Sequence, residues 1–304
     1  MFNKNRVDFW NKQRIGLVLA GGGGKGAFEA GAFQALYDLD YASKIRVVSG
    51  TSVGALNTLL FAMESRDLCR KVWEEVNFKA ILTPAKSGAI PEAANLIRSL
   101  VEKNFQFGEL PDLIRNIRDG NDCPLTQDGI WKIISENVDV SNVHKSNRDF
   151  YVCAYDIAAS RPQYFLLNRL PDDEVVKAVL ASSAIPVIFP PVVIRGKKYA
   201  DGGCNMPDYA AKNADNIPVL PLARYNLDRV IVIHLDPDDK SDYRATLGNT
   251  PVINVFPSKP LESFKGAGTL NFSQSAVKSH FAQGYYDTMA ELGSYMVNFL
   301  SLLR

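Results

Sequence analysis

The chain has 304 residues, of which 46% are hydrophobic and 22% charged, as in a globular protein that buries a sizeable core. Its 34 basic and 33 acidic residues give a formal net charge of +1, so it lacks the strong basic field of a nucleic-acid-binding protein. We therefore expect no nucleic-acid partner.

The N-terminus and the cysteines bear on where the protein works. Residues 1–14 contain no apolar run of the kind found in a secretion signal, and no segment is long and apolar enough to predict a transmembrane helix. The widely spaced cysteines form no C-x-x-C pair, which argues against a disulfide framework or a zinc site. They are Cys69, Cys123, Cys153 and Cys204. We expect a cytoplasmic protein with free thiols and no metal or other cofactor.

The first part of the chain alternates strands and helices. Residues 15–20 form an apolar run that predicts a buried strand, and a helix is expected from about Lys25 because Phe28, Ala32 and Leu36 recur at helical spacing. Residues 45–49 predict a second strand and residues 55–64 a second helix. This alternation is typical of parallel strands in a layered α/β core.

The pattern changes over residues 67–145. Amphipathic helices are expected at residues 72–76, 96–101 and 110–117, and no segment has the pattern of a strand. We interpret this stretch as a helical insertion. It is either a cap over the site or a helical wall of the core.

Strands return in the second half of the chain, at residues 150–154 and 163–167 with a turn at 160–162. An acidic first turn opens a helix over residues 172–181. Residues 192–194 and 198–200 predict a hairpin, and residues 229–235 and 252–256 predict two more strands. Residues 273–303 are predicted to be helical, with Gly284 and Gly293 as candidate break points. We expect residues 1–13 to form an N-terminal arm and residues 14–304 a single domain.

A serine stands in a sharp-turn motif at the end of the second predicted strand. Gly50-Thr51-Ser52-Val53-Gly54 has the form G-x-S-x-G between a strand and a helix. In that context the small flanking residues, Gly50 and Gly54, let the backbone turn and expose the serine hydroxyl at the strand tip. Ser52 is therefore the candidate nucleophile. It also begins a helix whose dipole favours a developing anion.

A glycine run follows the first predicted strand and consists of Gly21, Gly22, Gly23, Gly24, Lys25 and Gly26. It fits G-x-G-x-x-G, but the next strand lacks the terminal acidic residue that binds a dinucleotide ribose. A phosphate-binding P-loop also fails, because Gly26 follows Lys25 where Ser or Thr is required. The third interpretation is a loop whose backbone N–H groups stabilise an oxyanion beside the serine.

Two arrangements could supply the base. Asp201, followed by Gly202 and Gly203 at a predicted strand end, can act on Ser52 directly. The alternative is a Ser-Asp-His order with Ser52, Asp201 and His280, as in α/β-hydrolases. An Asp-Gly pair alone is usually a turn, so Asp201 gains its weight from the other motifs.

Together these motifs resemble the patatin-like phospholipases. That family combines a G-G-G-x-[KR]-G loop, a G-x-S-x-G elbow and a D-G-[GA] motif in this order, matched by residues 21–26, 50–54 and 201–203. Flanking similarity at residues 181–191 and 268–273 extends the resemblance over residues 13–290. One departure is that the family's Asn-x-Pro-Val-like segment comes late, at residues 216–219, after an apparent insertion, although residues 205–207 could fill its place.

The resemblance implies a three-layer α/β/α fold with a mainly parallel central sheet and a helical insertion. It also implies a serine lipid acyl hydrolase that cleaves phospholipids or lysophospholipids through a Ser52–Asp201 dyad, with the N–H groups of residues 22–25 holding the oxyanion. Such substrates imply peripheral contact with a membrane surface. They also require an apolar channel. The middle helices could line it, or the last helix with Phe281, Tyr285, Tyr286 and Met289, and plain core packing is the alternative interpretation of these residues. A carboxylesterase or thioesterase that uses His280 and a non-catalytic ligand-binding module are the alternatives.

Overall fold

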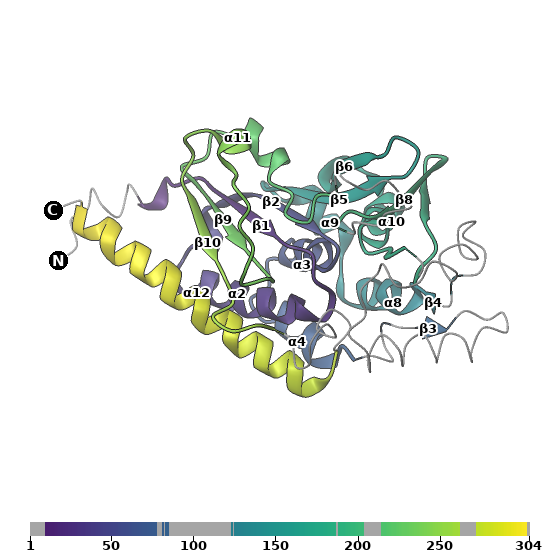
Figure 1. Ribbon diagram of the computed structural model, residues 1–304, viewed down its shortest axis with the longest axis horizontal. Coiled ribbons are helices and arrows are strands. Elements are labelled where there is room, and N and C mark those ends of the chain that lie inside the picture. The colour runs from purple at the N-terminus through teal and green to yellow at the C-terminus, as the bar shows by residue number, and fades with distance from the viewer. Residues whose placement is uncertain are drawn as a thin grey trace.

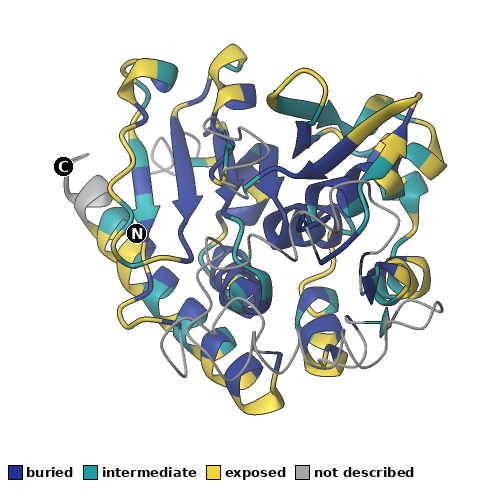
Figure 2. Cartoon of the chain, turned by 45° about the vertical axis from the view of Figure 1, so that its right-hand side comes forward, coloured by how far each residue is buried: buried dark blue, intermediate teal, exposed yellow. Residues whose placement is uncertain are grey.

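The structure, a computed structural model, describes residues 10–77, 81, 83–84, 123, 125–186, 188–203, 214–261 and 272–302. Its core is a sheet in which five strands run parallel in the order β10-β9-β1-β2-β5 (Figure 1). These strands are β1 (Ile15–Leu19), β2 (Ile45–Thr51), β5 (Asp149–Asp156), β9 (Arg229–Ile233) and β10 (Val252–Val255). Every residue of β1 and β9 is buried, as expected for parallel strands covered on both faces (Figure 2).

Helical segments cover the sheet on both sides. Two long helices, α2 (Ala27–Asp38) and α12 (Gln274–Leu302), pack against each other below the sheet in Figure 1, whereas α11 (Arg244–Leu247) lies above it. The 3₁₀ helix η6 (Leu220–Arg224) contacts both α11 and β2. Closer to β5, α3 (Val53–Phe61) and α10 (Asp172–Ser182) pack on the strands. The predicted three-layer α/β/α fold with a mainly parallel sheet is confirmed.

The sheet becomes mixed at β5. There β6 (Arg161–Leu166) pairs antiparallel with β5, as does β8 (Lys197–Asp201), which forms the predicted hairpin with β7 (Val192–Ile194). The strand β6 begins at Arg161, inside the predicted turn. Pro162 is tolerated there because β6 pairs only with β5, so the missing N–H can face away from the ladder.

Between residues 67 and 145 the described elements are α4 (Leu68–Glu75), α8 (Asp128–Asn137), α9 (Val140–Lys145) and two short strands, β3 (Thr83–Pro84) and β4 (Leu125–Thr126). The strands pair antiparallel, whereas the sequence predicted none. Two residues are too few to show a period of two, so the pattern could not reveal them. The predicted helix at residues 72–76 overlaps the end of α4, which stops one residue earlier, at Glu75. Those at 96–101 and 110–117 lie outside the described residues.

The last helix, α12, runs unbroken through both candidate break points. A Cβ on Gly284 would lie 1.9 Å from the carbonyl oxygen of Phe28, and a Cβ on Gly31 would lie 2.0 Å from that of Phe281. Gly284 therefore serves close packing between α2 and α12 rather than a break, and the two backbones touch where both helices lack a side chain.

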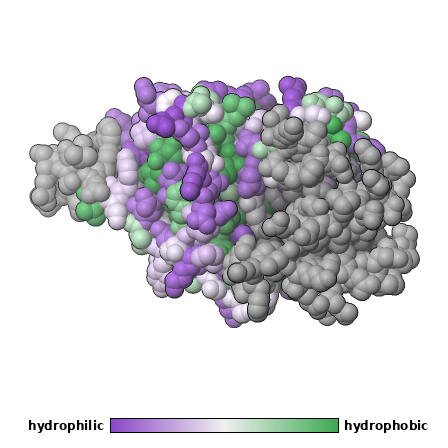
Figure 3. Space-filling view, viewed as in Figure 1, coloured by the Kyte–Doolittle hydropathy of each residue, from purple (hydrophilic) through white to green (hydrophobic). Residues whose placement is uncertain are grey.

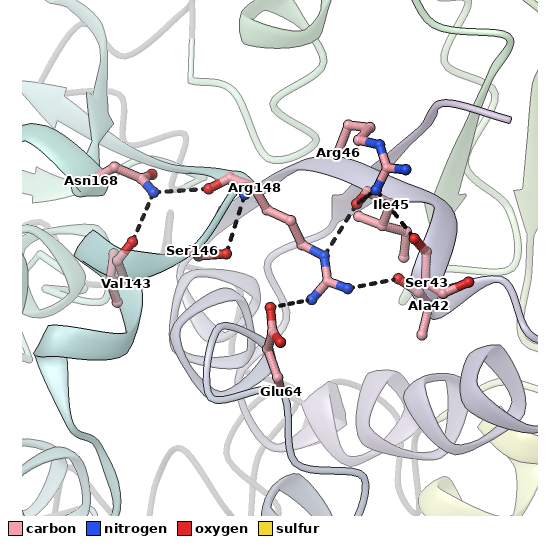
Figure 4. Close-up of polar contacts among 9 residues, drawn as sticks. All are labelled: Ala42, Ser43, Ile45, Arg46, Glu64, Val143, Ser146, Arg148 and Asn168. Atoms are coloured by element: carbon pink, nitrogen blue, oxygen red, sulfur yellow. Dashed lines mark hydrogen bonds and ion pairs between the residues drawn. The ribbon is translucent and has the colours of Figure 1, made fainter. Parts of the chain in front are cut away.

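Arg148 fastens the start of β5 to the start of β2 (Figure 4). Its Nε donates to the Ile45 carbonyl at 3.2 Å, and its Nη2 donates to the Ala42 carbonyl, also at 3.2 Å, in the 3₁₀ helix η2 (Ala42–Lys44). Its Nη1 forms an ion pair with Glu64 at 2.8 Å. Arginine suits this role because its planar group carries several donors in a fixed geometry. These contacts help to fix the register between β2 and β5, on which the site depends.

Residues 10–13, within the predicted N-terminal arm, pack against the domain. The Trp10 ring meets that of Tyr41 edge-to-face at 4.8 Å, and Gln13 Oε1 accepts a 2.7 Å hydrogen bond from the buried Arg229. These contacts join the start of the described chain to β9 and to the segment before β2.

Candidate active site

Ser52 lies in the elbow, residues 50–54, between β2 and α3. Its backbone has φ 55° and ψ −121°, and it occupies the N-cap position of α3. A positive φ is unusual for a residue with a side chain, and it matches the strained strand-to-helix turn that exposes a nucleophile. The residue is nevertheless buried, with 8% of its surface exposed.

The elbow glycines permit close approach of backbone segments. A Cβ on Gly50 would lie 2.2 Å from the carbonyl oxygen of Gly54, and a Cβ on Gly54 would lie 2.5 Å from that of Leu19. A side chain at either position would collide with backbone atoms. The turn at Ser52 can therefore be this tight, and this close to the end of β1, only with glycine at both positions.

Ser182 holds the backbone of Ser52 from outside the elbow. Its Oγ accepts a 2.8 Å hydrogen bond from the backbone N–H of Ser52 and donates a 2.5 Å bond to the carbonyl oxygen of Cys153. The side chain is fully buried at the end of α10. The sequence analysis did not single out this residue, although it stands in the segment, residues 181–191, that resembles the family.

Asp201 is placed next to the elbow because β2 and β8 both pair with β5. Residues 149–153 of β5 pair with β2, residues 154–156 pair with β8, and β6 pairs with residues 151–156. A strand residue has only two hydrogen-bonding sides, so β2 and β8 occupy the same side of β5 in succession. Thr51, at the end of β2, pairs with Cys153, and Asp201, at the end of β8, pairs with the next residue, Ala154. The C-terminal ends of β2 and β8 therefore face each other, one residue apart along β5, which is a rise of about 3.3 Å.

The Asp201 loop, residues 201–203, is held by backbone contacts. Gly203 N–H donates to Asp201 Oδ1 at 2.8 Å, and Asp201 N–H donates to the Ala184 carbonyl at 2.9 Å. Asp201 is 3% exposed. A Cβ on Gly202 would lie 2.6 Å from the carbonyl oxygen of Cys153, so this loop also packs directly on β5.

The glycine loop, residues 21–26, connects β1 to α2 and includes the 3₁₀ helix η1 (Gly23–Gly26). Gly23 has φ 56° and lines the same cavity as Ser52. A Cβ on Gly21 would lie 3.2 Å from Ser52 Cβ, so this loop passes close to Ser52. Two of its N–H groups already have partners: Gly21 donates to the Asn216 carbonyl at 3.0 Å, and Lys25 to that of Gly22 at 3.2 Å.

A buried polar network supports the glycine loop. Asn57 Nδ2 donates to the Gly26 carbonyl at 3.0 Å and to Glu29 Oε2 at 2.7 Å, while Asn57 Oδ1 accepts from Trp73 Nε1 at 2.9 Å. Burial raises the pKa of Glu29 well above its ordinary value. The sequence analysis missed these residues. An acid on an otherwise apolar helix face, at Ala27-Phe28-Glu29-Ala30, was the available signal.

A narrow apolar cavity of about 50 Å³ opens beside Ser52. Its walls come from the start of α3, from α4, from α8 and from the segment after α10. The lining residues are Gly23, Ser52, Val53, Leu56, Trp73, Val76, Ile81, Ile130, Ile133, Ser183, Ile185, Phe189 and Phe272. Of the two helical regions considered for an apolar channel, α4 and α8 supply lining residues of this cavity, whereas residues 281–289 of α12 are not among them.

His280 lies on α12 and is buried. Burial lowers its pKa, and hydrogen bonds with the backbone of Gly24 and Leu261 oppose that effect in part. The ring thus lies against the backbone of the glycine loop at Gly24. Among the described residues no group of three His, Cys, Asp or Glu side chains could hold a metal ion, and no helix there is long and apolar enough to cross a membrane.

The fold and the elbow define an α/β protein of the kind that presents a serine at the tip of a strand, beside a glycine-rich loop. Residues 17–223, well over half of the chain, match the family of patatin-like phospholipases. The chain belongs to this family, and the resemblance drawn from the three motifs is confirmed.

The individual proteins that this chain resembles share little sequence identity with it. The uncharacterized protein YjjU of Escherichia coli (strain K12) is 27% identical over 228 residues, which are 74% of this chain and 52% of that protein, so the chain spans about half the length of this relative. The type III effector ExoU of Pseudomonas aeruginosa aligns with 93% of this chain and 53% of its own, at 17% identity and a TM-score of 0.46. Human GIVD cytosolic phospholipase A2 aligns with 96% of this chain and 59% of its own, at 10% identity and a TM-score of 0.47.

Proposed function

We propose that this protein hydrolyses carboxylic esters of phospholipids or lysophospholipids through a dyad of Ser52 and Asp201. The observation that carries the proposal is the head-on meeting of β2 and β8 along one side of β5, which brings Asp201 next to the elbow. The glycine loop approaches Ser52 from the end of β1. Nucleophile, base and oxyanion donors thus come from three neighbouring strand ends.

In the proposed reaction Asp201 accepts the proton of Ser52 as the Ser52 Oγ attacks the ester carbonyl. The oxyanion is held by N–H groups of Gly22, Gly23 and Gly24, because those of Gly21 and Lys25 already donate to protein carbonyls. The alcohol leaves with the proton from Asp201. Water then attacks the acyl-enzyme, Asp201 accepts its proton, and the fatty acid departs as Ser52 regains its hydrogen. Removing one oxyanion donor typically costs about 2.7–4 kcal/mol of transition-state stabilisation.

The cavity favours an apolar acyl chain. Its walls are almost entirely apolar, so a hydrocarbon chain bound there would be removed from water. The substrate would reach the site from a membrane surface by peripheral contact. Figure 3 shows hydrophilic and hydrophobic residues interleaved over the described part of one face, so the proposal assigns no docking face.

A triad with His280 is the competing mechanism. The His280 ring lies against the backbone of Gly24 and Leu261. The dyad is favoured because Asp201 adjoins the elbow in the sheet itself. A non-catalytic module would have no use for a strained serine at φ 55°.

Fluorophosphonate labelling and hydrolysis of phosphatidylcholine vesicles test the proposal on wild type, Ser52→Ala, Asp201→Asn and His280→Ala. We expect Ser52→Ala to abolish both signals and Asp201→Asn to lower hydrolysis by about 10²–10⁴-fold. Vesicles should compete with the label, and His280→Ala should retain turnover. Near-normal turnover of Asp201→Asn together with loss in His280→Ala would establish the triad instead. An unlabelled, folded wild type would favour the non-catalytic module.

A further inference from the structure

Asp215 and Asn216 lie where three parts of the candidate site come together. They belong to the segment, residues 216–219 and the residue before it, whose late position in the chain is the departure from the family pattern. Neither residue has a part in the reaction as described above. Their contacts nevertheless reach the glycine loop, the elbow strand and the Asp201 loop.

Asn216 closes a ring of two hydrogen bonds with Gly21. The Gly21 N–H donates to the Asn216 carbonyl at 3.0 Å, and Asn216 Nδ2 donates to the Gly21 carbonyl at 3.2 Å. Both polar groups of the Gly21 backbone are thereby fixed by one residue. The first residue of the glycine loop cannot rotate without breaking one of these bonds.

The same side chain touches the Asp201 loop. A Cβ on Gly203 would lie 2.2 Å from Asn216 Oδ1, and a Cβ on Gly21 would lie 2.3 Å from the same atom. The amide oxygen of the exposed Asn216 therefore lies beside both loops, at positions where neither loop has a side chain.

Asp215 ties the remaining parts together through its main chain. Its N–H donates to the Gly202 carbonyl at 2.8 Å, and its carbonyl accepts from Thr51 Oγ1 at 2.8 Å. Its carboxyl oxygen Oδ2 accepts a 2.5 Å bond from the Tyr164 hydroxyl on β6. Asp215 thus links the last residue of β2 to the Asp201 loop and is itself anchored to the sheet.

We propose that Asp215 and Asn216 form a clamp that holds the glycine loop and the Asp201 loop at a fixed separation around Ser52, with Asn216 as a positioning residue. The inference rests on the proposed function, since it assigns the two loops to the oxyanion and the base. Backbone loops built of glycine have little intrinsic rigidity, so their geometry must be imposed from outside. A displacement of about 1 Å between such groups can lower a rate by roughly 10²-fold.

The test compares wild type with Asn216→Asp and Asn216→Ala. Aspartate keeps the shape of asparagine but replaces the donor to the Gly21 carbonyl with an acceptor, and alanine removes the amide. We expect kcat for a soluble ester and the rate of fluorophosphonate labelling to fall about 10²-fold in both variants, with KM changed less than about threefold. Asn142→Asp, an exposed asparagine on α9, is the matched control and should behave as wild type.

Hydrogen exchange gives a readout that does not need activity. In Asn216→Ala the backbone amides of residues 20–26 should exchange faster than in wild type, with protection elsewhere unchanged. Wild-type kcat and wild-type exchange in both variants would overturn the clamp, and so would a raised KM with normal kcat, which would make Asn216 a substrate contact. Failure of the proposed function is a separate outcome, in which wild type itself neither hydrolyses esters nor labels at Ser52 and the exchange data alone decide on the clamp.

Discussion

At the scale of single residues, the candidate site depends on polar side chains that do not line the cavity beside Ser52. Ser182 is the clearest case, because its hydroxyl both accepts from the Ser52 N–H and donates to the Cys153 carbonyl in a fully buried position. A buried backbone group left without a partner costs about 1–3 kcal/mol. Ser182 therefore stabilises the strained backbone of Ser52 as well as the contact between β5 and α10.

We predict that Ser182→Ala lowers the free energy of unfolding by about 1–3 kcal/mol. It should also slow fluorophosphonate labelling by at least about tenfold, because the Ser52 backbone can then shift. Urea unfolding and labelling rates measure the two effects. Ser135→Ala, which removes an exposed hydroxyl on α8, provides the control. A destabilised variant that labels at the wild-type rate would show that Ser182 has only a structural role.

Glu29 is a second such residue, and its effect depends on pH. Burial raises its pKa in the folded protein well above the ordinary value of 4.5. Above the pKa of the unfolded chain, the unfolded state releases this proton while the folded state keeps it. Stability therefore falls as pH rises, by at most about 1.4 kcal/mol per pH unit, until the folded-state pKa is reached.

Glu29→Gln removes this titration but keeps an uncharged side chain of the same shape. We predict that the free energy of unfolding of the variant, minus that of wild type, increases as the pH is raised from 5 to 8. Urea unfolding at several pH values measures the difference. Glu136→Gln is the control, because the Glu136 side chain is 60% exposed. It measures how much the pH dependence changes when an exposed glutamate is replaced. A difference that does not vary with pH would contradict a protonated Glu29 in the folded protein.

At the scale of elements, the glycine loop is connected to α2 and contacted by α12. The loop leads directly into α2, and His280 on α12 contacts the backbone of Gly24. The two helices touch at Gly31 and Gly284, where the obstacles to a Cβ are carbonyl oxygens of the facing helix. Backbone atoms cannot move aside as a flexible side chain can, so the contact leaves no room for a methyl group.

We predict that Gly284→Ala lowers the free energy of unfolding by about 1–3 kcal/mol through overpacking. Gly293→Ala in the same helix should raise it by about 0.5–1 kcal/mol, because a Cβ there meets nothing within 4 Å and alanine favours the helix. Urea unfolding of the two variants compares identical substitutions in one helix. Equal effects of either sign would mean that the close contact between α2 and α12 does not exist in solution.

At the scale of the whole molecule, local patterns predicted most of the parallel half of the sheet. The apolar runs at residues 15–20 and 45–49 correspond to β1 and β2 because a strand covered on both faces needs no partner to be recognised. The meeting of β2 with β8 could not be predicted, because Ser52 and Asp201 are 149 positions apart in the sequence and only pairing with β5 brings them together. The sequence also could not predict the roles of Ser182, Asn57 and Asn216, because each residue depends on partners far away in the sequence.

Because the candidate site is assembled from β1, β2, β8 and the segment at Asn216, it can exist only when the whole sheet is formed. We therefore predict that Ser52 labelling and the fluorescence of Trp73 and the other tryptophans are lost in the same urea transition. Gly284→Ala should move both transitions to lower urea by the same amount, although Gly284 lines no part of the cavity. If labelling disappeared at a urea concentration where fluorescence was still native, the glycine loop would open as a unit of its own, held more weakly than the sheet. The contacts of Gly21 with Asn216 and of Gly26 with Asn57 argue against such separate opening, because each joins the loop to a different part of the core.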